Sequence, residues 1–311
     1  MKYTKIRTFI PTLIKGMGMG AADIVPGVSG GTIAFITGIY EELIHSIHQA
    51  PKALKNLVSH KSLGRFWTEV NGNFLAAVFG GVGISIISLT RLIKFMLAEY
   101  PVPLNGFFFG LIAASAVVLG LEIKNKNIVA YTVLGAGIII AAFISNATPA
   151  TTPDASWFIF LSGCIAICAM ILPGISGSFI LLLMGKYQVI IEAVSEFNIK
   201  VLAIFAVGCI VGLLTFARVL SKLFKHYKSL TMALLTGFLA GSLLKVWPWK
   251  KTTEYRINSK GEEVPFLQEN ISPLSFPDEP MIIATVLLFL LGAGLVMGLH
   301  FTRAKKESAE V

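Results

Sequence analysis

Long apolar runs separated by short polar segments set the pattern of this chain. A helix needs about 20 residues to cross a bilayer, and several of the runs approach or reach that length. The pattern predicts membrane-spanning helices at 74–90, 104–121, 128–145, 200–217, 230–246 and 281–301.

Two longer apolar stretches, 8–48 and 157–195, are each interrupted by the sequence Pro-Gly-x-Ser-Gly. Proline and glycine break helices, so we predict helix breaks at Pro26 and Pro173. Each stretch is therefore expected to form a re-entrant hairpin of two helical arms joined by an unwound turn. Such a hairpin returns to the side of the membrane from which it entered.

The interrupted stretches are copies of one sequence. The segment 24–31, Ile-Val-Pro-Gly-Val-Ser-Gly-Gly, returns 147 residues later at 171–178 as Ile-Leu-Pro-Gly-Ile-Ser-Gly-Ser. A further stretch repeats at an offset of 127. We therefore expect an all-α polytopic membrane protein with one membrane domain, 1–311, made of repeat 1 at 8–145 and repeat 2 at 157–301.

The composition supports a membrane location. Hydrophobic residues make up 55% of the chain and charged residues 14%, whereas soluble domains carry about 25% charged residues. The net charge of +9 could indicate nucleic acid, but no soluble basic domain is present to bind it. We therefore expect no nucleic-acid partner. Because the three cysteines lack metal spacing and no catalytic constellation appears, we also expect no metal, no cofactor and no enzyme activity.

The charges of the loops predict the topology. With the N-terminus in the cytoplasm, the cytoplasmic segments, which include 49–73, hold sixteen Lys and Arg, and the outer segments hold seven. The C-terminus is then cytoplasmic as well. Each copy has one hairpin and three spans, and because three is odd the second copy is inverted relative to the first. Inverted repeats with broken helices are typical of transporters whose site lies between the halves.

The broken hairpins predict an anion site. Ser29 and Ser176 are suitable N-caps, and a helix that begins at each would direct free N–H groups and its positive dipole end into a cavity. The alternative is that proline and glycine only kink and pack the helices. Because the motif occurs twice at matching positions, we favour the site. The expected phosphate contacts are Gly27, Ser29, Gly30, Gly31, Gly174, Ser176 and Gly177.

Three ionisable residues are further candidates. Arg91 and Arg218 occupy matching positions at the ends of spans, where a guanidinium group could neutralise a phosphate or simply reach the headgroups. Asp23 precedes the first motif and corresponds to Met170 in the second. An acid at this depth is costly, so Asp23 is the candidate for proton or ion coupling, with a wetted carboxylate at the hairpin mouth as the alternative.

The segment 18–32, Gly-Met-Gly-Ala-Ala-Asp-Ile-Val-Pro-Gly-Val-Ser-Gly-Gly-Thr, strongly resembles the bacterial integral membrane family catalogued as domain of unknown function 368. The second motif fits as well, and the resemblance covers about 8–300. Members of this family are implicated as polyprenyl-phosphate transporters that return undecaprenyl phosphate from the outer to the inner leaflet of the cytoplasmic membrane. The resemblance implies that role here, with the headgroup at the hairpin tips and the bilayer and a polyprenyl phosphate lipid as partners.

The residues by themselves support only a transporter with a site that suits an anion. Three alternatives therefore stay open: a gradient-driven transporter of a small soluble anion, a membrane enzyme acting on lipid phosphates, and a structural scaffold. The enzyme would need a nucleophile or a metal site, and the paired broken helices disfavour a scaffold. The sequence predicts no particular oligomeric state.

Overall fold

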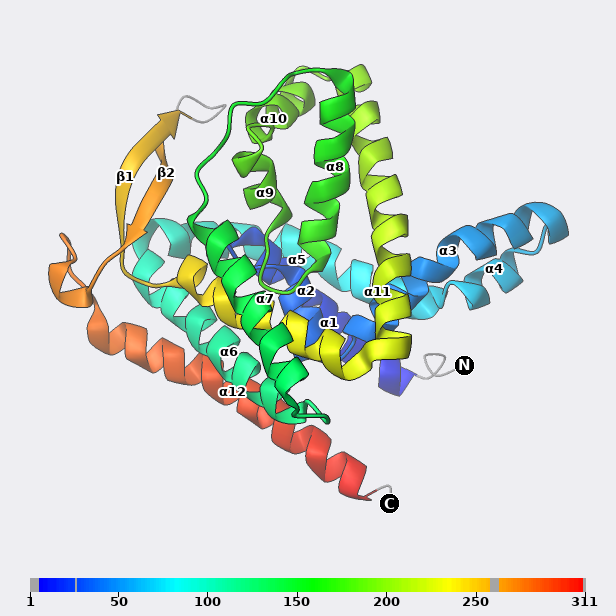
Figure 1. Ribbon diagram of the computed structural model, residues 1–311, viewed down its shortest axis with the longest axis horizontal. Coiled ribbons are helices and arrows are strands. Elements are labelled where there is room, and N and C mark those ends of the chain that lie inside the picture. The colour runs from blue at the N-terminus through cyan, green and yellow to red at the C-terminus, as the bar shows by residue number, and fades with distance from the viewer. Residues whose placement is uncertain (1–5, 26, 258–262, 310–311) are drawn as a thin grey trace.

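The computed structural model describes residues 6–25, 27–257 and 263–309, and these are largely helical. Within them, five helices are long and apolar enough to cross a membrane, or up to six if a bent pair counts as one span. In Figure 1, α8 and the first part of α11 rise above the diagonal helices α6, α7 and α12. The prediction of a helical, multi-pass membrane protein is therefore confirmed.

The two halves of the chain have similar orders of elements. The first half consists of α1 (Ile6–Ile24), α2 (Gly30–Ile36), α3 (Tyr40–His60), α4 (Leu63–Glu69), α5 (Gly72–Glu99), α6 (Pro101–Glu122) and α7 (Ile128–Asn146). The second half consists of α8 (Ser156–Ile171), α9 (Gly177–Leu183), α10 (Tyr187–Ser195), α11 (Ile199–Gly241), η1 (Ser242–Val246), β1 (Lys250–Ile257), β2 (Glu263–Asn270), η2 (Pro273–Ser275) and α12 (Ile282–Ala309).

Each predicted hairpin consists of three helices and not of two arms. After the seven residues of α2 the chain turns at Gly38, and after the seven residues of α9 it turns at Gly185. These glycines have φ values of 68° and 64°, in the left-handed region that side chains disfavour. The axes of α9 and α10 are bent by 108°. The expectation of two arms is therefore corrected, because a second glycine breaks the returning arm.

Corresponding positions of the two halves share their backbone conformation. Gly27 has a φ of 87° and Gly174, 147 residues later, has a φ of 83°. Tyr100 ends α5 with φ −133° and ψ 50°, and Tyr227 interrupts α11 with φ −134° and ψ 43°. The resemblance between the halves therefore extends from the sequence to the dihedral angles.

Glycines allow the closest helix contacts. Gly16 and Gly81 bring α1 against α5, and a Cβ atom on Gly81 would overlap the carbonyl oxygen of Leu13. In the second half, Gly208 of α11 lies in the same way against the carbonyl of Phe160 in α8. Since lipid gives helices no hydrophobic reason to associate, such close approach of small residues supplies much of the packing attraction.

Two other helix pairs join the halves. The helix α6 packs along α12, with Gly110 against the carbonyl of Phe289. The helix α7 packs along the last part of α11, with Gly237 against the carbonyl of Leu134. The last helix of each half, α7 or α12, thus packs against a helix of the other half.

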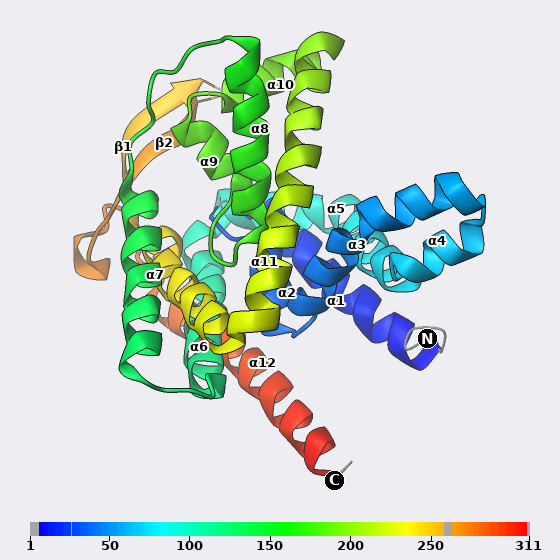
Figure 2. The same cartoon turned by 45° about the vertical axis from the view of Figure 1, so that its right-hand side comes forward.

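The segment 218–229, which was expected to connect two separate spans, belongs to α11. This helix continues from Ile199 to Gly241 and is broken only at Tyr227. Figure 2 shows its first part beside α8 and its last part, beyond the bend, beside α7. Leu220 and Phe224 are one helical turn apart and buried, so the lysine-rich segment is amphipathic. The expected span 230–246 ends in the 3₁₀ helix η1.

Two polar segments acquire structure that the sequence did not predict. Most of 49–73 is helical, because α3 extends to His60 and α4 follows it. The segment 247–280 contains β1 and β2, an antiparallel pair and the only sheet in the described part of the chain. In Figure 1 this pair and the α3–α4 segment lie on opposite sides of the molecule.

Candidate functional site

The breaks of the two hairpins meet inside the molecule. We call residues 25–29 the first tip and residues 172–176 the second tip. Ser29 Oγ donates a hydrogen bond of 2.9 Å to the carbonyl oxygen of Met170, and the N–H of Gly174 donates one of 2.9 Å to Thr32 Oγ1. A Cβ atom on Gly31 would lie 2.5 Å from the carbonyl oxygen of Ile171. Two segments more than 140 residues apart in the chain therefore form one polar junction.

At the first tip, protein side chains occupy the start of α2. Asp23 Oδ1 accepts the N–H of Gly30 at 2.6 Å, and Ser29 Oγ accepts the N–H of Gly31 at 3.1 Å. Ser29 is therefore the N-cap that the sequence predicted, but these two N–H groups are not free for an anion. The carboxylate of Asp23 takes the place that an anion would have at a helix start. Pro26 lies outside the described residues.

The second tip is built differently. Ser176 precedes α9 but makes no capping hydrogen bond with its side chain. Its hydroxyl lies 2.9 Å from that of Ser178, and Ser178 is exposed. Pro173 and Gly177 are buried, and a Cβ atom on Gly177 would lie 2.6 Å from the carbonyl oxygen of Ala166. The second tip thus offers a pair of hydroxyl groups where the first tip has a carboxylate.

The helix η1 contacts both tips. A Cβ atom on Gly174 would lie 2.7 Å from Ser242 Oγ, and one on Gly27 would lie 3.0 Å from Lys245 Cγ. The ammonium group of Lys245 lies 3.8 Å from the centroid of the Phe179 ring in α9. Sequence reasoning missed Lys245. The available signal was a lysine within the apolar run 230–246, because an ionisable residue in a membrane segment is by default a functional candidate.

The two candidate arginines are exposed on their helices. Arg91 lies on α5 and Arg218 on α11, and no described ion pair or hydrogen bond connects either of them to a tip. The charge of Arg218 interacts with His48 of α3. The structure therefore brings the hairpin motifs together but gives the arginines no described contact with them.

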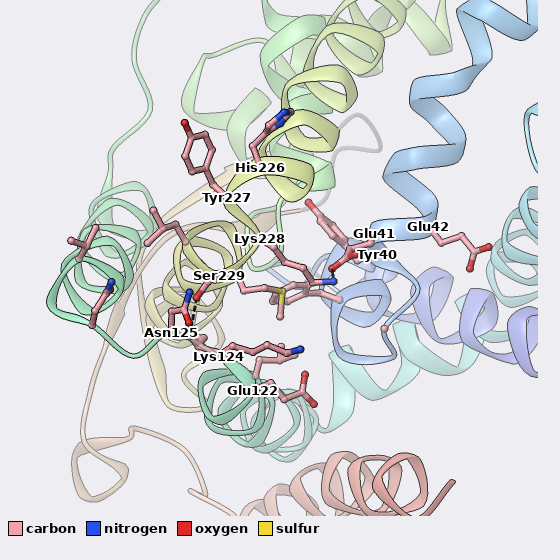
Figure 3. A pocket seen from close by; sticks show the side chains of 18 of the residues that line it. Tyr40, Glu41, Glu42, Glu122, Lys124, Asn125, His226, Tyr227, Lys228 and Ser229 are labelled. Atoms are coloured by element: carbon pink, nitrogen blue, oxygen red, sulfur yellow. Dashed lines mark hydrogen bonds and ion pairs between the residues drawn. The ribbon is translucent and has the colours of Figure 1, made fainter. Parts of the chain in front are cut away.

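A cavity of about 1250 Å³ opens near the far end of α2. Figure 3 shows its charged lining, which comes from the start of α3, the connection between α6 and α7, and the bend of α11. Lys228 and Glu41 form an ion pair of 2.6 Å on one wall, and His300 lies 3.4 Å from Glu122 on another. No described residue of either tip lines this cavity. The seven residues of α2, about 10 Å of helix, separate it from the first tip.

The contrast between the two serines gives a direct prediction. Ser29→Ala should destabilise the protein by about 1–2 kcal/mol, because it removes the cap of α2 and leaves the Met170 carbonyl without its donor. Ser176→Ala should change stability by less than about 0.5 kcal/mol, since that serine caps nothing. Thermal unfolding of the purified variants in one detergent measures both. Equal unfolding temperatures for the two variants would contradict the asymmetry of the tips.

The chain has clear relatives among known proteins. A profile described as undecaprenyl phosphate translocase-like matches residues 19–264. A protein of Vibrio cholerae named polyprenyl-phosphate transporter is 44% identical over 300 residues, which cover 95% of this chain and 97% of that protein. A Staphylococcus aureus protein of the same name is 34% identical over 255 residues, 76% of this chain and 85% of that protein.

No solved structure matches the chain. The residues matched by the family profile contain both tips, η1 and Lys245. The family that the hairpin motifs indicated is thereby confirmed, and the chain belongs to the undecaprenyl phosphate translocase-like family.

Proposed function

We propose that this protein is a transporter that returns polyprenyl phosphate, such as undecaprenyl phosphate, from the outer to the inner leaflet of the bacterial cytoplasmic membrane. Two relatives, at 44% and 34% identity, are named polyprenyl-phosphate transporter. In this proposal the lipid is moved without a chemical reaction.

The observation that carries the proposal is the junction of the two tips. Backbone that leaves the helix at membrane depth is tolerated only where it is buried in protein or lines a wet cavity. Here two such breaks meet, with hydroxyl groups of Ser176 and Ser178 and the ammonium group of Lys245 beside them. We expect the phosphate to bind at this junction while the prenyl tail remains in lipid.

The predicted phosphate contacts contribute unequally in this proposal. Gly174 and Ser176 of the second tip, and Gly177 at the start of α9, are the contacts we retain for the headgroup. Gly27 and Ser29 of the first tip, and Gly30 and Gly31 at the start of α2, shape the junction, since the N–H groups of the last two are already bonded. Arg91 and Arg218 are assigned to attracting the lipid headgroup at the two membrane surfaces.

We further propose that the two halves, 8–145 and 157–301, are inverted repeats with both termini in the cytoplasm. The loop charges support this orientation. The cavity of about 1250 Å³ lies between segments that the charges place on the cytoplasmic side. The described conformation is then the one open to the cytoplasm, and rocking of the halves would open the opposite side.

Asp23 is the proposed coupling residue. Moving one negative charge inward opposes an inside-negative potential by about 2.3 kcal/mol per 100 mV. A proton or another cation that accompanies the lipid removes this cost. Asp23 accepts the N–H of Gly30, so a change in the charge of its carboxylate acts directly on the start of α2.

Depletion of this protein, in cells that also lack redundant carriers, tests the function. Undecaprenyl phosphate should accumulate on the outer surface, where a headgroup-binding antibiotic detects it, and re-expression should clear it. If the exposed lipid stays constant, the assignment to lipid falls, and the transporter of a small soluble anion becomes the better hypothesis.

A further inference from the structure

We propose that Lys245 and Lys250 together form the headgroup site and bind a phosphate monoester beside the second tip. This inference rests on the proposed function and deepens it, because it names the groups that recognise the phosphate.

The position of Lys245 is fixed by both hairpins. Its side chain passes Gly27 of the first tip, and its ammonium group faces the ring of Phe179 in α9. Ser178, the residue before Phe179, carries an exposed hydroxyl paired with that of Ser176. A phosphate that contacts the ammonium group on its open side would therefore have hydroxyl donors on the same turn of α9.

The second lysine, Lys250, is the first residue of β1 and contacts the backbone of Lys245. Lys250 Nζ donates a hydrogen bond of 2.5 Å to the carbonyl oxygen of Lys245. The β-strand pair holds this end of η1 through further bonds, since Asn270 Nδ2 donates to the Leu244 carbonyl at 2.7 Å and the Trp247 indole donates to the Ile271 carbonyl at 2.9 Å. The ammonium group of Lys250 is thus held against the backbone of Lys245, where the charge of the Lys245 side chain acts on it.

The pair has no acidic partner among the described ion pairs. Burial, and then the neighbouring charge of Lys245, lower the pKa of Lys250 to about 7. Two cations placed together out of water are costly unless an anion accompanies them. A bound phosphate would supply that anion.

Lys186, which is buried whereas Lys245 and Lys250 are half-buried, shows what a purely structural lysine looks like in this chain. Lys186 is 1% exposed, and its ammonium group lies 2.5 Å from Asp154 and 3.0 Å from the carbonyl oxygen of Thr152. Its charge is therefore compensated by the protein. Lys245 and Lys250 lack such a carboxylate in the described part of the chain, which is the arrangement expected of a site that receives its negative charge from a ligand.

The test compares lysines at neighbouring positions. The full chain is purified in lipid nanodiscs, and binding of undecaprenyl phosphate is followed by tryptophan fluorescence, since Trp247 and Trp249 lie between the two lysines in the chain. We expect Lys245→Gln and Lys250→Gln each to weaken binding at least about tenfold. Lys245→Arg, which keeps the charge, should restore part of it. Lys251→Gln is the matched control, because Lys251 is exposed on the same strand.

Inorganic phosphate, added alone to the same samples, distinguishes a lipid headgroup from a free phosphate. If the wild type binds the lipid and both glutamine variants bind it equally well, the lysine site is overturned and the proposed transport stands. If only inorganic phosphate binds, and Lys245→Gln abolishes that binding, the lysine site stands and the lipid function falls. If neither probe binds the wild type, both fall. Unfolding temperatures of the variants within a few degrees of the wild type show that the fold is intact.

Discussion

Replacing Gly81 with leucine should strongly destabilise the folded protein. In the α1–α5 pair a Cβ atom at this position would overlap the backbone of Leu13, and backbone cannot move aside as a flexible side chain can. The helices would have to separate, which also removes the contacts around Gly16. We expect a loss of about 3 kcal/mol of stability, at the upper end of overpacking effects. Size-exclusion profiles and unfolding temperatures in detergent measure it.

The adjacent residue provides the control. Gly80 is exposed on the same helix, and a Cβ atom there would meet nothing within 4 Å. Gly80→Leu should therefore behave like the wild type, although its helix propensity and composition match those of Gly81→Leu. Gly208→Leu should reproduce the defect in the α8–α11 pair, because Gly208 meets Phe160 as Gly81 meets Leu13. If Gly81→Leu and Gly80→Leu are equally stable, close packing does not hold α1 to α5.

Replacing Asp23 with asparagine should separate its two roles. Asparagine keeps an oxygen that can accept the N–H of Gly30, so the start of α2 stays capped and the unfolding temperature should stay near that of the wild type. The charge is lost, and with it the proposed proton coupling. We then expect accumulation of polyprenyl phosphate against an inside-negative potential to fall about 50-fold per 100 mV.

Transport into vesicles with and without an imposed potential measures this effect. The difference between wild type and Asp23→Asn should shrink when the potential is removed. Asp23→Ala, which also loses the acceptor, should lower the stability by about 1 kcal/mol in addition. Transport by Asp23→Asn at the wild-type level under a potential would leave Asp23 as a cap of α2 and nothing more.

Local features of the sequence were sufficient to predict the elements that carry the proposed function. Apolar runs of membrane length predicted the long helices, and the Pro-Gly motifs predicted both hairpin breaks. The repeat at an offset of 147 matches the boundaries of α2 and α9. These features succeed because helix formation and helix breaking depend on residues within a few positions of each other.

Prediction from neighbouring residues failed where a group could bond or pack with more than one partner. The N–H groups at the first tip were expected to be free, but the carboxylate of Asp23 accepts the N–H of Gly30, seven residues later. The lysines of 218–229 suggested a loop, yet burial of Leu220 and Phe224 keeps this segment in α11. In both cases a contact that the residue pattern alone did not specify decided the outcome.

The sequence alone thus determined that this is a duplicated helical membrane protein with two broken hairpins, because apolar length and Pro-Gly breaks act locally. Only the tertiary structure decided that the tips bond to each other, that they differ in their capping, that Lys245 lies beside them, and that Lys250 bonds the carbonyl of Lys245. The bonds between the tips depend on atoms more than 140 residues apart in the chain being brought within hydrogen-bond distance. Glycines permit this approach, since Gly31 lies against the carbonyl of Ile171 where a side chain would not fit.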